Sequence, residues 1–145
     1  MALERLPKAD LIDANGSPLA GTLKNRYLAE IRFLRAMFYY ELASIYGGVP
    51  LVTTTLTVDD RTKLVRASSR EIFEFVEKEL LAIANDPDML SAKTMAPTET
   101  GRATQEAAWA LLARTYLFFA KDDTALFAKA KDAAKKVIDS NAFAL

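Results

Sequence analysis

The sequence predicts an all-α protein, a helical repeat array of about four main helices with two long loops. Apolar residues recur with the 3.6-residue period of an α-helix in four separate segments. Stretches rich in glycine, proline, asparagine and aspartate lie between these segments. The chain has 145 residues, a length that suits one domain, so we expect residues 1–145 to form a single helical-repeat domain.

The first helix is predicted from about Leu23 to Tyr46. Thr22 is a suitable N-cap, because its hydroxyl can accept a hydrogen bond from a first-turn amide. Gly47 and Pro50 end the helix, since glycine accepts a left-handed C-cap and proline cannot continue the hydrogen bonding. The polar stripe of this helix is narrow and the rest of its circumference is apolar. We therefore expect a central helix that is covered on several sides.

The second helix is predicted from about Ser69 to Ala84. The stretch SSRE forms a capping box, with Ser68 at the N-cap and Glu71 three residues later. The apolar positions of this helix share one face, which we expect to be buried: Ile72, Phe73, Val76, Leu80 and Ile83.

Two more helices are predicted in the C-terminal half. The third runs from about Thr104 to Ala120 and is mostly apolar, so we expect it to be buried. The fourth runs from about Thr124 to Ser140 and is capped by Asp122 or Asp123. Its predicted buried face consists of Phe127, Ala130, Ala134, Val137 and Ile138.

Two long loops connect these helices. The loop after the first helix has about twenty residues, and its threonine and valine content permits a short extended piece. The second covers residues 85–103. Connections of this length are uncommon in compact domains and are often functional.

The four helices pair as two similar units. The tetratricopeptide spacing W-x₂-L-G-x₂-Y is matched, with alanine in place of glycine, by Trp109, Leu112, Ala113 and Tyr116. Small residues at Ala130 and Ala134 repeat the spacing of the second helix of such a unit. In the first pair the similar positions are Ala29, Phe33, Ala36 and Tyr40. The sequence thus predicts a degenerate tetratricopeptide-like array of two units.

Four blocks in order carry a family resemblance. They are LAEIRFLRAMFYYELASIYGGVPLVT (28–53), VRASSREIFEFVEKEL (65–80), GRATQEAAWALLARTYLFFA (101–120) and AKKVIDSNAFAL (134–145). Together these blocks resemble the SusD/RagB family, SusD-like nutrient-binding outer-membrane lipoproteins, over about 120 residues of the chain. Members are several times longer, so the chain resembles their tetratricopeptide-like helical core.

The resemblance implies a function that the residue pattern does not itself give. Members sit on the cell surface of Gram-negative bacteria, bind glycans or other nutrients, and cover a SusC-like TonB-dependent transporter. They are not enzymes. We therefore expect a helical scaffold that contacts such a transporter, with a glycan or oligosaccharide site mostly outside this chain. The parent protein would be an outer-membrane lipoprotein, and this chain a soluble fragment without signal or anchor.

Composition excludes several other classes. Lysine plus arginine and aspartate plus glutamate number 19 each, so no basic excess favours nucleic acid. Cysteine and histidine are absent, which removes thiol nucleophiles, histidine bases and the commonest zinc ligands. Paired aspartates lie in separate loops with nothing to bring them together. We expect no catalytic residues, no metal and no cofactor.

A few side chains are candidates for specific roles. Arg35, in FLRA, is expected to form a structural ion pair with Glu71 or Glu79. Arg102, in GRAT, is expected to form a structural ion pair and to brace a helix start. An aromatic ring with a polar tip can stack on a sugar, an alternative open to Tyr39, Tyr40, Tyr46 and Trp109, but at helical spacing within apolar runs these residues are expected to be core. Tyr46, at the exit of the first helix, is the candidate ligand contact.

A second function stays open at this point. A self-contained tetratricopeptide-like adaptor would bind a peptide or protein in the groove of the array. Under either reading, an array of two units leaves outer faces uncovered, so we expect exposed apolar surface and a tendency to self-associate.

Overall fold

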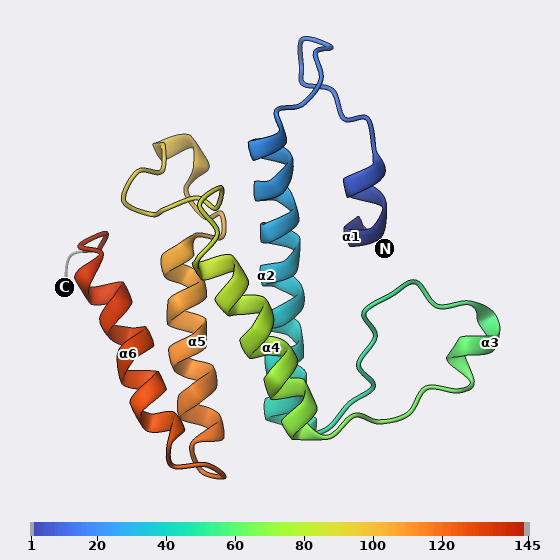
Figure 1. The fold of residues 1–145 in the computed structure, drawn as a ribbon, viewed down its shortest axis with the longest axis vertical. Coiled ribbons are helices and arrows are strands. Elements are labelled where there is room, and N and C mark those ends of the chain that lie inside the picture. The colour runs from blue at the N-terminus through green and yellow to red at the C-terminus, as the bar shows by residue number, and fades with distance from the viewer. Residues whose placement is uncertain (1, 144–145) are drawn as a thin grey trace.

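Helix α2, Gly21–Tyr46, is the longest element of the protein, and the other main helices pack beside it or beside its neighbour (Figure 1). The computed structural model describes residues 2–143. Within this range the regular elements are all helices, and the one β-bridge is isolated and forms no strand. The predicted all-α fold class is therefore confirmed. The elements are α1 (Ala2–Arg5), η1 (Leu6–Lys8), α2, α3 (Val58–Arg61), α4 (Ser69–Ala84), η2 (Pro97–Glu99), α5 (Gln105–Phe119) and α6 (Leu126–Asp139).

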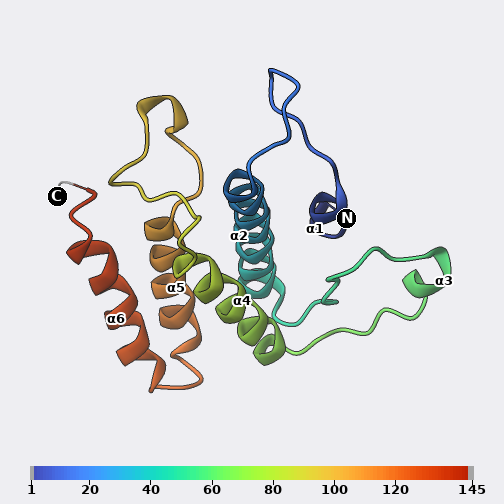
Figure 2. The same ribbon diagram turned by 45° about the horizontal axis from the view of Figure 1, so that its top comes forward.

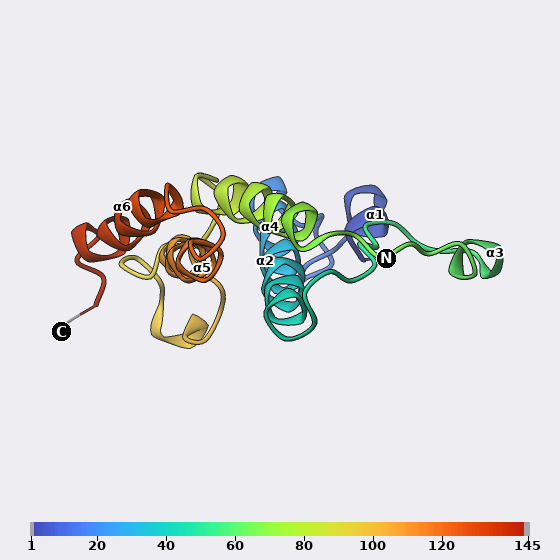
Figure 3. The same ribbon diagram turned by 90° about the horizontal axis from the view of Figure 1, so that it is seen from below.

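The four long helices form two layers. Seen from below, α2 and α5 lie in one layer and α4 and α6 in the other (Figure 3). Helix α4 packs against both α2 and α5, and α6 packs against α5. Turning the molecule shows the same order of helices, with α1 on the far side of α2 from α5 (Figure 2). The arrangement is the two helix pairs that the sequence predicts, α2 with α4 and α5 with α6.

Helix α4 supplies the centre of the core. Its five predicted core residues, Ile72, Phe73, Val76, Leu80 and Ile83, are each at most 1% exposed. The predicted capping box is present, because Ser68 Oγ accepts from the Glu71 amide at 3.2 Å and the Glu71 carboxylate accepts from the Ser68 amide at 2.7 Å. Phe73 stacks edge-on to Tyr116 of α5, which joins the two helix pairs.

Helix α2 is covered on fewer sides than its composition predicts. Its buried residues are small or lie on one narrow face: Ala29, Ala36, Tyr40 and Ala43. Small side chains let the α4 backbone approach closely, as the repeat pattern requires. On the other side, Phe38 and Ile45 are 59% and 68% exposed, because no element described here packs over them.

The two ends of α2 differ in how well the sequence predicts them. The expected Thr22 cap is wrong, since the helix begins at Gly21 after Ala20 and has no side-chain cap. Thr22 therefore lies inside the first turn, where helical dihedral angles keep a hydroxyl from capping. The C-terminal prediction is confirmed: Gly47 has φ of +71° and its amide bonds the Ala43 carbonyl.

Helix α5 follows the prediction closely and α6 does not. Thr104 caps α5 by accepting from the Ala107 amide at 3.1 Å. Helix α6 starts later than predicted and has no side-chain cap, although Asp123 accepts from the Ala125 amide just before it. Its predicted face is wrong in part, because Phe127 and Ile138 are 52% and 63% exposed. Ala130 is buried as predicted, and the other buried residues of α6 are Leu126 and Ala133.

The loop after α2 contains a helix rather than the extended piece its composition permits. Thr57 and Asp60 form a second capping box, and this box starts the single turn α3. A threonine hydroxyl that bonds a backbone amide three residues on favours a helix start over a strand. The loop leaves the body of the protein at the C-terminal end of α2 and returns to the start of α4 (Figure 1).

Candidate interaction surface

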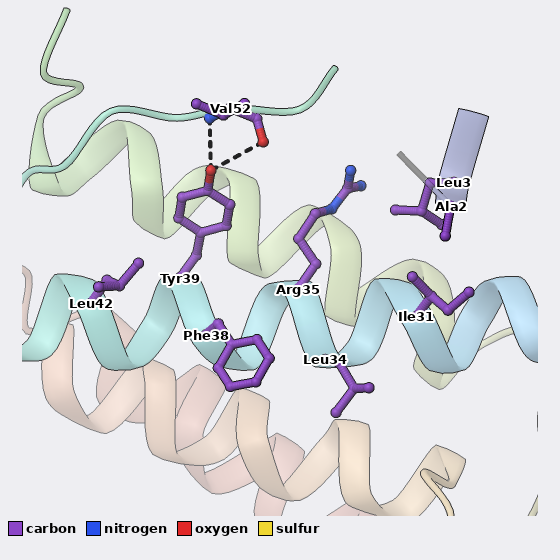
Figure 4. Close-up of a pocket in the computed structure, with 9 residues that line it drawn as sticks. All are labelled: Ala2, Leu3, Ile31, Leu34, Arg35, Phe38, Tyr39, Leu42 and Val52. Atoms are coloured by element: carbon purple, nitrogen blue, oxygen red, sulfur yellow. Dashed lines mark hydrogen bonds between the residues drawn. The ribbon is translucent and has the colours of Figure 1, made fainter. Parts of the chain in front are cut away.

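An apolar groove runs along the outer face of α2. Figure 4 shows its lining side chains, most of which project from successive turns of α2, while Ala2 and Leu3 come from α1 and Val52 from the loop after α2. The groove encloses about 440 Å³ and is lined by Ala2, Leu3, Ile31, Leu34, Arg35, Phe38, Tyr39, Leu42 and Val52. The lining residues of α2 recur every three to four positions and form one continuous stripe along the helix.

Tyr39 fixes the beginning of the long loop on this groove. Its hydroxyl accepts from the Val52 amide at 2.7 Å and donates to the Val52 carbonyl at 3.1 Å (Figure 4). Its ring meets Phe75 of α4 edge-on at 5.4 Å. A single side chain thereby holds the loop against both helices of the first pair.

Arg35 lies at the junction of the groove with the core. Its Nη2 is 2.7 Å from Glu79 Oε2, and Arg32 Nη2 is 3.2 Å from Glu79 Oε1. The Arg35 guanidinium also lies over the Phe75 ring at 5.2 Å. Glu79 is 7% exposed. Burial raises the pKa of its carboxyl, but the hydrogen bonds from the two arginines outweigh burial and hold the pKa below its ordinary value.

Arg102 joins the second long loop to α2. Its Nε and Nη2 donate to the two oxygens of Glu30 at 2.8 and 2.7 Å, and its guanidinium lies 5.1 Å from the Tyr27 ring centre. Arg26 pairs with Glu99 of η2, one turn from Glu30. These ion pairs tie the loop to the N-terminal half of α2. No local pattern indicates that Glu30 is the partner of Arg102, because the two residues are 72 positions apart.

The remaining candidates occupy varied environments. Tyr46 is 62% exposed at the end of α2, and its carbonyl accepts from Arg66 Nη2 at 2.6 Å. Its role as a ligand contact stays a prediction. Tyr40 is buried, whereas Trp109 is only half-buried. Two aspartates of the second long loop are hydrogen-bonded: Asp86 accepts from the Asp88 amide within the loop, and Asp88 accepts from the Asn25 side chain of α2.

The part of the chain that the structure describes contains neither a cluster of metal-ligating residues nor a membrane-spanning helix. Within residues 2–143, no group of three or more acidic, histidine or cysteine side chains is placed to hold a metal ion. None of the helices in that range combines the length and apolarity needed to cross a bilayer.

Comparison with known proteins gives one consistent family. The family model described as "Starch-binding associating with outer membrane" matches residues 1–117. The starch-binding protein SusD of Bacteroides thetaiotaomicron is 34% identical over 137 residues, which cover 90% of this chain and 22% of that protein.

Solved structures agree with the sequence matches. A SusD homolog from Bacteroides thetaiotaomicron superposes with a TM-score of 0.84 at 25% identity, covering 99% of this chain and 27% of that one. A SusD superfamily protein from Parabacteroides distasonis gives 0.80 at 30% identity, covering 99% and 29%. The chain thus spans less than a third of the length of these relatives. With the family model matched over most of the chain and the same helical arrangement in solved members, this chain belongs to the SusD-like family, whose members associate with the outer membrane.

Proposed function

We propose that this chain is the helical scaffold of a SusD-like cell-surface protein that binds glycans as nutrients and docks on a SusC-like TonB-dependent transporter. The observation that carries the proposal is the match of residues 1–117 to a starch-binding family. In the complete protein a lipoprotein anchor would hold this scaffold at the outer membrane. The chain's part is binding and support rather than catalysis.

The geometry supports a scaffold in a specific way. Two long loops are fastened to α2 at different places, one by Arg102 on Glu30 and the other by Tyr39 on Val52. Recognition loops bind best when a rigid frame positions their bases, because less conformational entropy is lost on binding. Helix α2 is such a frame, since α4 clamps it through the Arg35–Glu79 ion pair.

The exposed stripe of α2 supports the docking part of the proposal. Phe38 lines the groove of Figure 4, and exposed Ile45 lies two turns further along the same face of α2. Apolar patches of this kind mark protein–protein contacts, because leaving them in water is unfavourable. Tyr46, exposed at the end of the same helix, is the proposed ligand contact within this chain.

A second function is favoured by a different groove. Between α2 and the start of α5, a cavity of about 490 Å³ is lined by Glu30, Phe33, Leu34, Met37, Gly101, Arg102, Ala103 and Ala107. It lies on the first-helix side of both pairs, which suits a peptide held by an independent adaptor.

One experiment separates the two functions. The source gene is sequenced past both ends of this chain, and the encoded protein is isolated from membranes and tested for oligosaccharide binding and for a co-purifying transporter. The scaffold proposal expects a lipoprotein signal, a much longer reading frame, the transporter and glycan affinity. A gene product of this chain alone that binds no glycan would overturn it and leave the peptide adaptor.

A further inference from the structure

A third groove lies between the two helix pairs, away from α2. Helix α5 forms its floor, and α4 and α6 form its walls, as the layer arrangement in Figure 3 allows. It encloses about 300 Å³, at the lower end of the range for ligand pockets. Its lining residues are Glu77, Leu81, Trp109, Tyr116, Lys129, Asp132, Ala133 and Lys136.

The floor of this groove is aromatic. Trp109 is half-buried, so part of its indole faces the groove, and Tyr116 lies two turns further along α5. A pyranose ring presents an apolar face of C–H bonds, and an aromatic ring is the protein surface that matches such a face. Lys136 Nζ lies 5.9 Å from the Trp109 ring centre and Lys129 Nζ lies 5.5 Å from that of Tyr116.

The rim balances donors and acceptors. Glu77 and Asp132 carry negative charge, and Lys129 and Lys136 carry positive charge. A balanced rim favours neither an anion nor a cation, but it suits the hydroxyls of a neutral sugar, each of which donates and accepts. Charged partners also make the stronger hydrogen bonds.

One acceptor is held ready for a ligand. The Tyr116 hydroxyl donates to Glu77 Oε1 at 2.8 Å, and Lys129 Nζ donates to the same oxygen at 2.9 Å. Both hydrogen bonds end on the Oε1 atom of Glu77. Within residues 2–143, its Oε2 atom is therefore the oxygen that can accept from a sugar hydroxyl. Burial, and secondarily the hydrogen bond to Glu77, raises the pKa of Tyr116 above its ordinary value, so its hydroxyl stays protonated and donates.

Extension of the helical array would leave this groove open. At 100° per residue, the groove side of α6, which carries Asp132 and Lys136, lies about 150° from the side that carries Phe127 and Ile138. Phe127 and Ile138 are the exposed apolar residues that a following helix would cover. A neighbour on that side therefore does not reach the opposite side of α6.

We propose that the groove between α4, α5 and α6 is a contact site for one neutral pyranose unit of a glycan, stacked on Trp109 and hydrogen-bonded by Glu77, Asp132 and Lys136. This inference rests on the proposed function only in taking a glycan as the ligand. It goes beyond that function in placing a sugar contact inside the helical scaffold.

Trp109 is the sole tryptophan of the chain, so its fluorescence reports directly on the groove. The chain is titrated with maltoheptaose while tryptophan emission and backbone amide NMR shifts are followed. We expect a saturable change in emission and shifts that map to α5 and α6. Asp132→Ala and Lys136→Ala, both at exposed positions, should each weaken binding about tenfold through loss of a charged hydrogen bond.

Two further variants separate loss of the site from a change of charge or of fold. Lys131→Ala removes the same charge from an exposed position on α6 outside the groove and should leave affinity unchanged. Trp109→Phe, with helicity checked by circular dichroism, should weaken binding while the fold persists. Equal losses for Lys131→Ala and Lys136→Ala would indicate a charge effect only and overturn the site.

The remaining outcomes separate this inference from the proposed function. Complete protein that binds maltoheptaose with unchanged affinity in the Lys136→Ala and Trp109→Phe variants would overturn the groove site and leave the proposed function standing. Amide shifts confined to the neighbourhood of Tyr46 would do the same. A complete protein that binds no glycan at all would overturn both.

Discussion

Arg102 and Glu30, which are 72 positions apart, form a bidentate ion pair with N–O distances of 2.8 and 2.7 Å. The planar guanidinium matches both carboxylate oxygens and lies over the Tyr27 ring, a geometry that lysine cannot reproduce. The pair is partly exposed, with 31% of the Arg102 side chain and 18% of the Glu30 side chain accessible. Its main effect is to hold the loop before α5 on α2.

Arg102→Lys should therefore loosen the loop more than it destabilises the fold. We expect faster amide hydrogen exchange across residues 91–103 and a loss of about 1 kcal/mol in the free energy of unfolding. Hydrogen exchange followed by mass spectrometry measures the first effect and urea unfolding the second. Arg70→Lys is the control, because the Arg70–Glu74 pair lies on the exposed surface and its loss should change neither quantity.

Glu79→Gln should be among the most destabilising single polar changes in α4. It leaves Arg32 and Arg35 facing an uncharged amide, and Glu79 is 7% exposed. Because both arginines retain contact with water, we expect a loss of about 2 kcal/mol, less than for a fully buried pair. Urea unfolding measures it. Glu74→Gln, in the same helix but exposed, should stay within about 0.5 kcal/mol of the wild type, and a cost as large as that of Glu79→Gln would contradict the buried-pair account.

The ion pairs of Glu79 with Arg32 and Arg35 make the free energy of unfolding depend on pH. The folded-state pKa of Glu79 lies below its ordinary value, so the unfolded chain binds the proton first as pH falls. The stabilisation is therefore present above the unfolded pKa of about 4.3 and is lost as pH drops through the lower folded-state pKa. The gap in unfolding free energy between wild type and Glu79→Gln should narrow below about pH 4. A gap that stays constant down to full acid unfolding would count against this linkage.

Gly48 lies directly against the backbone at the other end of the long loop. A Cβ at this position would lie 2.1 Å from the Ala67 carbonyl oxygen, which is backbone and cannot swing away. Gly48→Ala should cost about 1–3 kcal/mol of unfolding free energy and shift the amide resonances of both loop ends. Gly21→Ala is the control, because nothing lies within 4 Å of its Cβ position at the start of α2. That change should be neutral or stabilising.

The exposed stripe of α2 should drive self-association. We expect a sedimentation coefficient that rises with concentration, because Phe38 and Ile45 are 59% and 68% exposed. Phe38→Glu should abolish the rise. Phe127→Glu, at a similarly exposed site on α6, identifies the contact, since it should leave association by α2 intact. A monomer at every concentration in the wild type would refute the prediction.

Local pattern predicted most of the helical frame. The five apolar positions of α4 and its capping box lie within one helix, so their spacing alone indicates which side is buried. The Thr104 start of α5 is equally local. The exposed side of α2 was not predictable in the same way, because coverage of a helix depends on which elements lie beside it. The predicted burial of Phe127 and Ile138 is wrong for the same reason.

The candidate surfaces depend on contacts between distant segments, which one sequence does not reveal. Arg35 was expected to meet one of two carboxylates in α4, and the structure places it on Glu79. Glu30 as partner of Arg102, and Val52 as partner of Tyr39, had no signal in the local pattern. The half-buried position of Trp109 likewise depends on how far α4 and α6 stand apart over α5.

The loop between α2 and α4 is closed where it leaves the protein. The Ala67 amide bonds the Val49 carbonyl at 3.1 Å, and Arg66 bonds the Tyr46 carbonyl at 2.6 Å. Because this stem holds the two ends together, each doubling of the segment between them costs only about 0.6 kcal/mol in chain entropy. The packing of α2 and α4 therefore does not depend on the loop between them. A segment of another length or sequence can replace residues 53–64 while the two helices keep their packing. The protein thus contains a graft point, where new recognition surface can be added without redesigning the core.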